Sequence, residues 1–186
     1  MTRIIAGAAG SLTLRVPRSG TRPTSDRVRE ALFSSLQSRG LLDDAAVLDL
    51  YAGTGALGLE AASRGATDVV LVDRAAPAAA VCKENARAVK QRVRGTLALD
   101  VRAQSALGYL RDTARVFDLV FIDPPYEVDE DEVVEVLTAL VPQLAPDAIV
   151  LLERSTRSPE PAWPDGLEAW SKRAYGDTMV WEAKRV

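Results

Sequence analysis

The chain has 186 residues, of which 47% are hydrophobic and 26% charged, a size and composition typical of one globular domain with a proper core. It contains no histidine and a single cysteine, Cys82, which excludes Ser-His-Asp and Cys-His catalysis, histidine or multi-cysteine zinc sites and an internal disulfide. The net charge is −3, but residues 1–40 hold seven arginines against Asp26 and Glu30, a balance of +5, while the rest of the chain carries −8. Such an asymmetry is typical of a basic arm that meets a polyanion such as nucleic acid, or of an arginine-rich arm that is merely solvated.

The sequence contains no run near the ~18 consecutive apolar residues that a membrane span requires. Residues 4–14 are uncharged and follow Arg3, but Gly7, Gly10 and Ser11 make them a poor secretory signal. We therefore expect a cytoplasmic protein, in agreement with its cysteine content.

The N-terminal elements are expected to be a hairpin and a helix. Residues 3–7 and 12–17 are predicted as two short strands joined by a glycine-containing turn, and residues 18–23 as a loop. Residues 24–26, Thr-Ser-Asp, supply N-cap and first-turn residues for a helix. Helical spacing predicts the following residues on its buried face: Val28, Ala31, Leu32, Ser35 and Leu36.

From residue 45 onward, short apolar runs alternate with helical stretches. Strands are predicted at residues 46–51, 68–73, 97–101, 117–123 and 148–153, and helices at 56–64, 77–89, 107–113 and 130–140. This alternation indicates an α/β fold with a mostly parallel sheet that helices cover on both faces. Residues 167–175 and 178–185 are predicted as an antiparallel pair that closes one edge. We expect a domain at residues 41–186, preceded by an N-terminal extension at residues 1–40.

The first stretch that indicates chemistry is residues 47–58, VLDLYAGTGALG, which combines a buried strand, a glycine-rich turn and the start of a helix. Glycines there let the backbone approach a ligand closely, and the helix amides behind the turn can bind an anionic group such as a carboxylate. Asp73 closes the next apolar strand, at a position where a carboxylate can bind the hydroxyls of a ribose. The pattern favours an adenosine-containing cofactor over a purely structural turn, and leaves a dinucleotide and S-adenosylmethionine both open.

The second stretch is the strand at residues 117–122 with Asp123, Pro124, Pro125 and Tyr126 at its carboxyl end. Ligands of open α/β sheets bind at that end of the strands, so this tetrapeptide should face the same crevice as the glycine turn. An ionised Asp and two proline carbonyls offer acceptors without N–H donors, which suits a planar heterocycle that carries an exocyclic NH2 group. Tyr126 would stack on the ring. A rigid Pro-Pro turn is the structural alternative.

Taken together, the D-P-P-Y tetrapeptide and the upstream Asp-x-x-x-Gly-x-Gly turn resemble those of amino-group methyltransferases that use S-adenosylmethionine. Four blocks resemble the RsmD type in particular, namely RIIAG (3–7), RPTSDRVREALF (22–33), VLDLYAGTGALGLEAASRGA (47–66) and FDLVFIDPPY (117–126). Enzymes of this bacterial type methylate N2 of a guanine in 16S ribosomal RNA. The resemblance implies a Rossmann-like class I methyltransferase fold with a seven-stranded sheet and S-adenosyl-L-methionine as the cofactor.

The resemblance also implies which residues bind the cofactor. Asp49, Gly53 and Gly55 would lie at its methionine end and Asp73 at its ribose. Near the adenine the family tends to place an acidic residue, whereas this chain has Ser105 and Ala106. The full set of expected cofactor-binding residues is Asp49, Tyr51, Ala52, Gly53, Thr54, Gly55, Asp73, Arg74, Ser105, Ala106 and Asp123.

The catalytic and RNA-binding residues follow from the same resemblance. Asp123, Pro124, Pro125 and Tyr126 would grip the target guanine. A family block that borders both cofactor and RNA contains Thr24, Arg27 and Arg29. The early turn of the family usually carries basic residues, but here it reads Ala-Ala at positions 8–9, which shifts the expected RNA contacts to Arg15, Arg18 and Arg22.

The expected reaction is a direct displacement in which the guanine amine takes the methyl group and the Asp123 and Pro124 oxygens accept its hydrogens. No histidine base and no metal are required, and the acidic residues between 127 and 135 are expected to be first-turn acids of a helix. We expect a monomer that acts on 16S rRNA within the 30S subunit. A DNA adenine-N6 methyltransferase, a protein glutamine methyltransferase and a non-enzymatic RNA-binding module remain alternatives.

Overall fold

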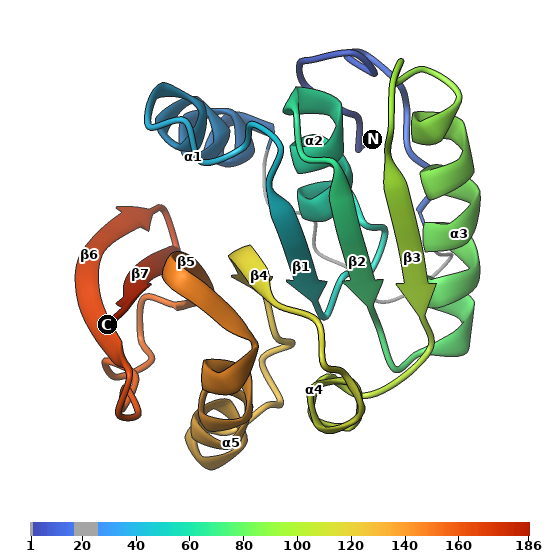
Figure 1. Ribbon diagram of the computed structural model, residues 1–186. Coiled ribbons are helices and arrows are strands. Elements are labelled where there is room, and N and C mark those ends of the chain that lie inside the picture. The colour runs from blue at the N-terminus through green and yellow to red at the C-terminus, as the bar shows by residue number, and fades with distance from the viewer. Residues whose placement is uncertain (1, 17–25) are drawn as a thin grey trace.

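A computed structural model describes residues 2–16 and 26–186 (Figure 1). The predicted loop at residues 18–23, together with Arg18, Arg22 and Thr24, lies outside the described residues. The elements in chain order are α1 (Asp26–Ser38), β1 (Ala46–Leu50), α2 (Ala56–Arg64), β2 (Asp68–Val72), α3 (Ala76–Lys90), β3 (Ala98–Arg102), α4 (Ala106–Asp112), β4 (Phe117–Ile122), α5 (Glu130–Leu140), the 3-10 turn η1 (Val141–Gln143), β5 (Leu144–Ser155), β6 (Leu167–Tyr175) and β7 (Thr178–Arg185). All predicted elements from residue 45 onward are confirmed, and β5 is longer than expected.

The strands of the described chain form one seven-stranded sheet in the order β3-β2-β1-β4-β5-β7-β6. Strands β1 to β5 are parallel, whereas β7 runs antiparallel to both of its neighbours. This confirms the class I methyltransferase architecture with an antiparallel C-terminal edge. The chain moves outward from β1 through β2 to β3 and then returns to the other side of β1 as β4. Ligands of such sheets bind at this switch point, beyond the carboxyl ends of β1 and β4.

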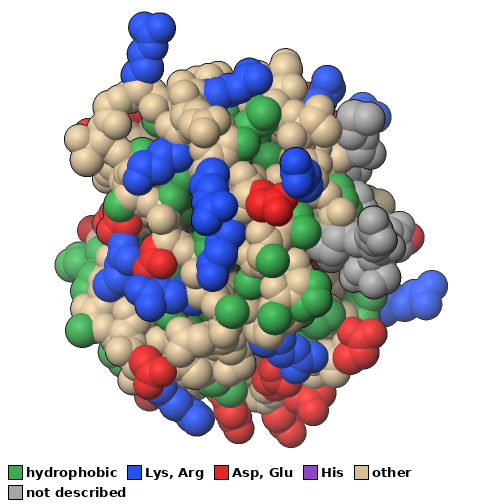
Figure 2. Space-filling model, turned by 90° about the vertical axis from the view of Figure 1, so that its right-hand side faces the viewer, with side chains coloured by type: hydrophobic (Ala, Val, Ile, Leu, Met, Phe, Trp, Pro, Cys, Tyr) green, Lys and Arg blue, Asp and Glu red, His purple; other side chains and the backbone are tan. Residues whose placement is uncertain are grey.

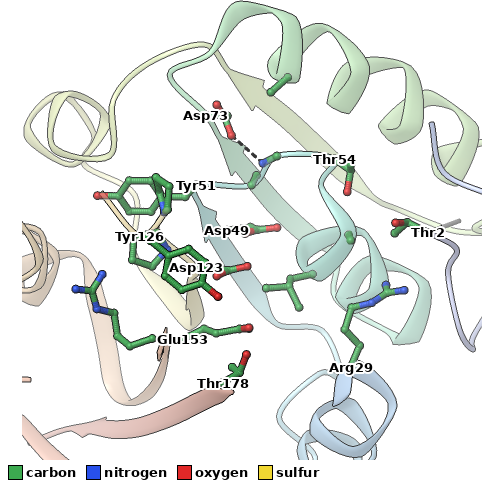
Figure 3. A pocket seen from close by; sticks show the side chains of 18 of the residues that line it. Thr2, Arg29, Asp49, Tyr51, Thr54, Asp73, Asp123, Tyr126, Glu153 and Thr178 are labelled. Carbon is green, nitrogen blue, oxygen red and sulfur yellow. Dashed lines mark hydrogen bonds between the residues drawn. The ribbon is translucent and has the colours of Figure 1, made fainter. Parts of the chain in front are cut away.

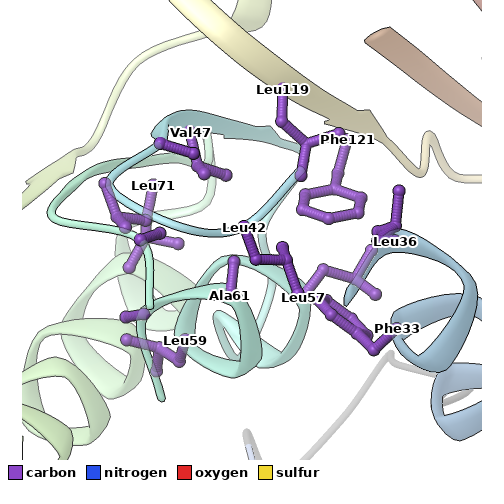
Figure 4. Packing of buried hydrophobic residues seen from close by; sticks show 14 of the residues in the cluster. Phe33, Leu36, Leu42, Val47, Leu57, Leu59, Ala61, Leu71, Leu119 and Phe121 are labelled. Carbon is purple, nitrogen blue, oxygen red and sulfur yellow. The ribbon is translucent and has the colours of Figure 1, made fainter. Parts of the chain in front are cut away.

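The core has two layers because successive strand residues point to opposite faces of the sheet. On one face, Val47, Leu119 and Phe121 pack against α1, α2 and α3. On the other face, Leu48, Val120 and Ile122 pack against α4 and α5. Figure 4 shows the first layer, in which the rings of Phe33 and Phe121 lie 5.5 Å apart between centroids. Burial of each such side chain contributes about 1.5–3 kcal/mol, which fixes the strand ends that carry the site.

The predicted N-terminal hairpin is confirmed only in part. Residues 3–7 and 12–16 are not extended strands, but an antiparallel bridge joins Arg3 to Thr13 around a turn, and the N–H groups of Ile4 and Leu14 donate to the carbonyls of Leu12 and Thr2, each at 2.9 Å. The backbone N–H groups of Ile5 and Ala6 instead donate to the buried carboxylate of Glu60, at 2.7 and 3.0 Å. The N–H groups of Ala8 and Ala9 donate to the backbone and hydroxyl oxygens of Ser63, at 2.7 and 2.9 Å. The part of the segment beyond this short pairing therefore docks on α2, because Glu60 and Ser63 of that helix accept the hydrogen bonds that a longer ladder would use.

The predicted buried face of α1 is correct for Leu32 and Leu36 but misplaced for Ala31, which is exposed. The structure buries Phe33 and Arg29 instead. Phe33 turns inward because it packs on Phe121, and Arg29 turns inward because it meets buried polar groups of the N-terminal segment and α2. None of the helices in the described ranges is both long and apolar enough to cross a lipid bilayer.

Candidate active site

A cavity of about 1230 Å³ lies beyond the carboxyl ends of the parallel strands (Figure 3). Its walls come from the glycine turn after β1, the end of β2, the first turn of α3, the D-P-P-Y segment after β4, the end of β5 and the β6–β7 turn. Single small-molecule sites typically occupy ~300–1000 Å³, so this cavity has room for more than one ligand group. It lies at the switch point of the sheet, where the sequence predicts it.

The glycine turn is held in a shape that few residues adopt. Gly53 and Gly55 have φ values of 55° and 79°, in the left-handed region that favours glycine. The N–H of Gly53 donates to the carboxylate of Asp73 at 2.8 Å, which fixes the turn against the end of β2 (Figure 3). Gly55 is the N-cap of α2 and provides no side-chain acceptor, so first-turn amides of this helix remain for an anionic ligand group.

Carboxylates gather on one side of the cavity. Asp49 is almost fully buried and accepts the N–H of Gly58 at 2.8 Å. Burial raises its pKa to about 7, and the nearby charge of Asp73 adds to this effect against the lowering effect of the Gly58 hydrogen bond. Burial also raises the pKa of Asp123 well above its ordinary value, and the charges of Glu153 and Asp49 raise it further. A cation placed among these groups would relieve their repulsion and desolvation.

Cationic and hydroxyl donors lie elsewhere on the cavity wall. Arg29 is only 1% exposed, and its Nη2 donates to the carbonyl of Arg3 and to Asp26, each at 2.7 Å. Its Nε and Nη1 atoms and the buried hydroxyl of Thr2 have no hydrogen-bond partner among residues 2–16 and 26–186, although Nη1 lies 3.9 Å from Glu60. Both residues line the cavity. Unpaired buried donors are costly, which makes this end of the cavity suitable for an anionic group.

The expected adenine contacts lie in a smaller adjoining pocket of about 60 Å³, which Ser105 and Ala106 line together with Asp73, Arg74 and Tyr51. Ser105 is the N-cap of α4, and its hydroxyl accepts the N–H of Gly108 at 3.0 Å. The structure thus brings Asp73, predicted to bind the ribose, and Ser105 and Ala106, predicted to border the adenine, to the same pocket.

The D-P-P-Y segment leaves β4 beside the glycine turn, where its Asp123 is partly buried and Pro124 buried. Tyr126 is 66% exposed at the rim, so its ring face is open to a ligand (Figure 3). The acidic residues that follow serve α5: Asp129 caps it by accepting the N–H of Glu132 at 2.8 Å, and Glu130 pairs with Arg154. The prediction of first-turn acids is correct for Glu130, Asp131 and Glu132, whereas Asp129 is the N-cap and Glu127 and Glu135 lie outside the first turn.

Glu153 and Thr178 also line the cavity and were not predicted. The parallel register pairs Ile122 with Leu152, so Asp123 and Glu153 follow at equivalent positions of neighbouring strands. Figure 3 shows both side chains directed into the cavity. A polar residue directly after an apolar strand was the available signal, and it is the same signal that identified Asp123.

The predicted RNA-binding residues divide into three groups. Arg15 and Arg27 are exposed, and Arg15 pairs with Glu84 at 2.5 Å. Arg18, Arg22 and Thr24 are outside the described residues. The expectation that Arg29 contacts RNA needs correction, because its guanidinium is buried against Glu60 and Asp26 and faces the cavity instead.

Comparisons with known proteins agree with this geometry. The family model described as Conserved hypothetical protein 95 matches residues 2–184. The chain is 31% identical to the YlbH protein of Bacillus subtilis over 189 residues, which covers 96% of each protein. It is 34% identical over 160 residues to a Haemophilus influenzae protein named ribosomal RNA small subunit methyltransferase D, which covers 84% of this chain and 80% of that one. The structure of the yhhF protein from Escherichia coli superposes with a TM-score of 0.85 at 30% identity, over 99% of this chain and 97% of that one.

Proposed function

The chain belongs to the RsmD-type family of S-adenosylmethionine-dependent methyltransferases, and from this premise we propose that it methylates the exocyclic N2 of a guanine in 16S ribosomal RNA. The name of the Haemophilus influenzae relative supports ribosomal RNA of the small subunit as the substrate. We further propose that the assembled 30S subunit in the cytoplasm is the form on which the enzyme acts, because a charge balance of only +5 in residues 1–40 leaves part of the recognition to ribosomal proteins.

One observation carries the proposal: Asp49 and Asp73 from the cofactor half and Asp123 with Tyr126 from the target half line the same cavity. The glycine turn and the D-P-P-Y segment follow adjacent strands, β1 and β4, whose register places Leu50 opposite Ile122. A donor and an acceptor of a methyl group bound at these two segments therefore meet at the switch point. Holding two reactants in this way supplies the proximity contribution to catalysis.

The residues present fit S-adenosylmethionine. Asp73 uses its carboxylate for the N–H groups of Gly53 and Ala75, and an ionised carboxylate has further lone pairs for ribose hydroxyls. Ser105 and Ala106 border the adjoining pocket, where the adenine would lie. The unpaired N–H groups of Arg29 and the first turn of α2 suit the carboxylate of the methionine end, and Asp49 suits its positive charge. When bound, this cofactor supplies an activated methyl group on a sulfonium sulfur.

The protein prepares the guanine amine for the reaction. The lone pair of that amine is delocalised into the ring, which makes it a poor nucleophile. The carboxylate of Asp123 and the carbonyl of Pro124 accept its two hydrogens, which favours a localised lone pair and stabilises the positive charge that develops on nitrogen. Tyr126 supplies an exposed ring on which the base stacks. Extrusion of a paired or stacked guanine into the cavity costs a few kcal/mol, which these contacts offset.

Replacement of Asp123 tests this assignment. Asp123→Ala should lower the turnover number by at least about 100-fold, because removal of one preorganised charge-stabilising group typically costs ~10²–10³ in rate. The affinity for S-adenosylmethionine, measured by calorimetry, should stay within a few-fold of the wild type. Asp131→Ala, which removes an exposed carboxylate from the first turn of α5, is the matched control. Equal turnover in the Asp123→Ala variant and in the wild type would contradict the mechanism.

A further inference from the structure

We infer that the solvent-exposed side of α3 binds the phosphate backbone of the ribosomal RNA that leads to the target nucleotide; this inference rests on the proposed function. Helix α3 and the turn that follows it carry five exposed cations and one exposed carboxylate, Glu84, in a chain whose net charge is −3. We call these cations the α3 basic surface; they are Lys83, Arg87, Lys90, Arg92 and Arg94. None of them forms an ion pair with the described residues.

The arrangement of these cations is unfavourable for an isolated helix. Lys83, Arg87 and Lys90 follow one another at spacings of four and three residues, so they share a single stripe of the helix surface. Cys82, Ala86 and Val89 form the opposite, buried side. Like charges at such spacings destabilise a helix by about 0.2–0.5 kcal/mol per pair, and this repulsion is relieved when an anion binds. The helix macrodipole favours Arg87 and Lys90 in the last turn, but it offers nothing to Lys83, which lies nearer the middle.

Figure 2 views the molecule from the side of α3. Lys and Arg side chains gather across the middle of this face, while acidic side chains are fewer and lie mainly at its lower edge. From Lys83 to Lys90 the stripe runs about 10 Å along the helix axis, at 1.5 Å per residue, which is long enough to contact more than one phosphate. Neutralisation of phosphates with release of counterions is the main source of affinity in nucleic-acid binding.

Two connections link the α3 basic surface to the active site. The first two turns of the same helix line the cavity through Pro77, Ala78 and Val81. The amide of Asn85 accepts the backbone N–H of Arg15 at 2.8 Å and donates to the carbonyls of Arg15 and Thr54, at 3.0 and 2.9 Å. This single side chain therefore ties the N-terminal segment and the glycine turn to α3. RNA that reaches the cavity past Arg15 lies within reach of the α3 basic surface.

The partner that this surface fits is a polyanion with regularly spaced charges. Arg15 neutralises Glu84, the one acidic residue of α3, at 2.5 Å, so the surface presents an almost uncompensated positive field. The exposed side chains of the stripe include no aromatic ring that could stack on bases. Contacts from Lys and Arg alone position a duplex or a folded RNA without reading its sequence. We therefore assign sequence selection to the cavity, and orientation of the subunit to the α3 basic surface.

Two double variants, in each of which two cations are replaced by neutral glutamine, test this inference. Arg87→Gln/Lys90→Gln removes two charges from the last turn of α3, and Arg111→Gln/Arg173→Gln removes two exposed charges from α4 and from β6 at the far edge of the sheet. Arg111 also lies in the last turn of its helix, so the control includes the macrodipole effect of one of the two charges. The probe is the 30S subunit that lacks the methyl group, with affinity measured at several salt concentrations. The free energy of unfolding and the affinity for S-adenosylmethionine verify that each variant is intact.

The α3 variant should bind the 30S subunit more weakly than the wild type, and the slope of log K against log salt should be smaller by about 1–2, because each lost phosphate contact removes about 0.7–0.9. The control variant should match the wild type. Equal affinity of the α3 variant and the wild type, or an equal loss in both variants, would overturn the inference. Product analysis with the wild type separates the two proposals, because methylation at a position other than guanine N2 refutes the proposed target and leaves the α3 effect to be judged by itself.

Discussion

The buried carboxyl group of Asp49 lowers the free energy of unfolding at neutral pH. Its carboxylate is buried at the switch point with Gly58 as its hydrogen-bond donor, and its pKa is raised to about 7. In the unfolded chain the same carboxyl ionises near 3.8. The folded protein therefore holds a proton on Asp49 that the unfolded chain releases, and this residue destabilises the fold progressively as the pH rises from about 4 to about 7. A bound cation would favour the ionised form and recover this energy.

Asp49→Asn should consequently stabilise the protein without cofactor. Near pH 4 the variant and the wild type should have similar free energies of unfolding. At pH 8 the free energy of unfolding of the variant should exceed that of the wild type by about 1–3 kcal/mol. Its affinity for S-adenosylmethionine should fall, because the amide carries no charge. Urea unfolding between pH 4.5 and 8 measures the first effect and calorimetry the second, with Asp131→Asn as the control. A stability difference that stays constant over this pH range would contradict the raised pKa.

Site residues could be predicted where a motif surrounds them. Asp49, Asp73 and Asp123 each follow or close an apolar strand inside a recognisable pattern, and the structure places all three on one cavity. Glu153 follows an apolar run, but no motif marks it as a site residue, and Thr2 belongs to no pattern, because chain segments distant in sequence bring it to the cavity. Arg29 was identified as a site residue but assigned to the wrong environment, since its burial depends on Glu60 of another helix.

At the scale of the elements, the N-terminal segment and α2 form a docked unit that local sequence patterns do not reveal. Gly7 has a φ of 80°, and a Cβ atom at this position would lie 1.9 Å from the backbone oxygen of Ser63. The buried carboxylate of Glu60 binds the segment through Ile5 and Ala6 and also accepts Arg64 Nε at 2.7 Å. The close approach at Gly7 is therefore a condition for the hydrogen bonds that hold the segment.

Gly7→Ala should destabilise the protein by about 2 kcal/mol more than Gly40→Ala does. Both glycines have positive φ values, 80° and 68°, but nothing lies within 4 Å of a Cβ atom at Gly40. The control thus carries the backbone strain alone, about 1–2 kcal/mol, whereas the Gly7 variant also loses the hydrogen bonds of Ala8 and Ala9 to Ser63, about 1 kcal/mol each. Thermal unfolding of both variants measures the difference. Equal destabilisation would show that the segment does not depend on this contact.

The elements from β1 onward could be predicted because their patterns are set by burial on both faces of the sheet, and burial acts on every residue of a strand. The short extent of the N-terminal hairpin could not, since its antiparallel pairing stops after a few residues and the N–H groups of Ile5 and Ala9 donate to α2 instead. For α1 the period was correct, and the buried face is shifted by part of a turn, so that Phe33 is buried in place of Ala31. Its phase is set by partners elsewhere in the chain, such as Phe121 for Phe33.

At the scale of the whole molecule, charge separates by function. Carboxylates gather inside the cavity, at Asp49, Asp123 and Glu153, where the sulfonium of the proposed cofactor site would compensate them. Exposed cations lie on α3, next to the segment that carries Arg15, where the proposed polyanion would compensate them. An overall charge of −3 therefore does not oppose RNA binding, because the two signs occupy different places.

The measurement that tests the central claim most directly is transfer of labelled methyl from S-adenosylmethionine to unmethylated 30S subunits, naked 16S rRNA, duplex DNA and total protein, with the modified residue identified by mass. We predict label as N2-methylguanosine in ribosomal RNA, more in the 30S subunit than in naked RNA, and none with Asp123→Ala. Label as N6-methyladenine in DNA or as methylglutamine in protein would keep the cofactor site but contradict the proposed substrate.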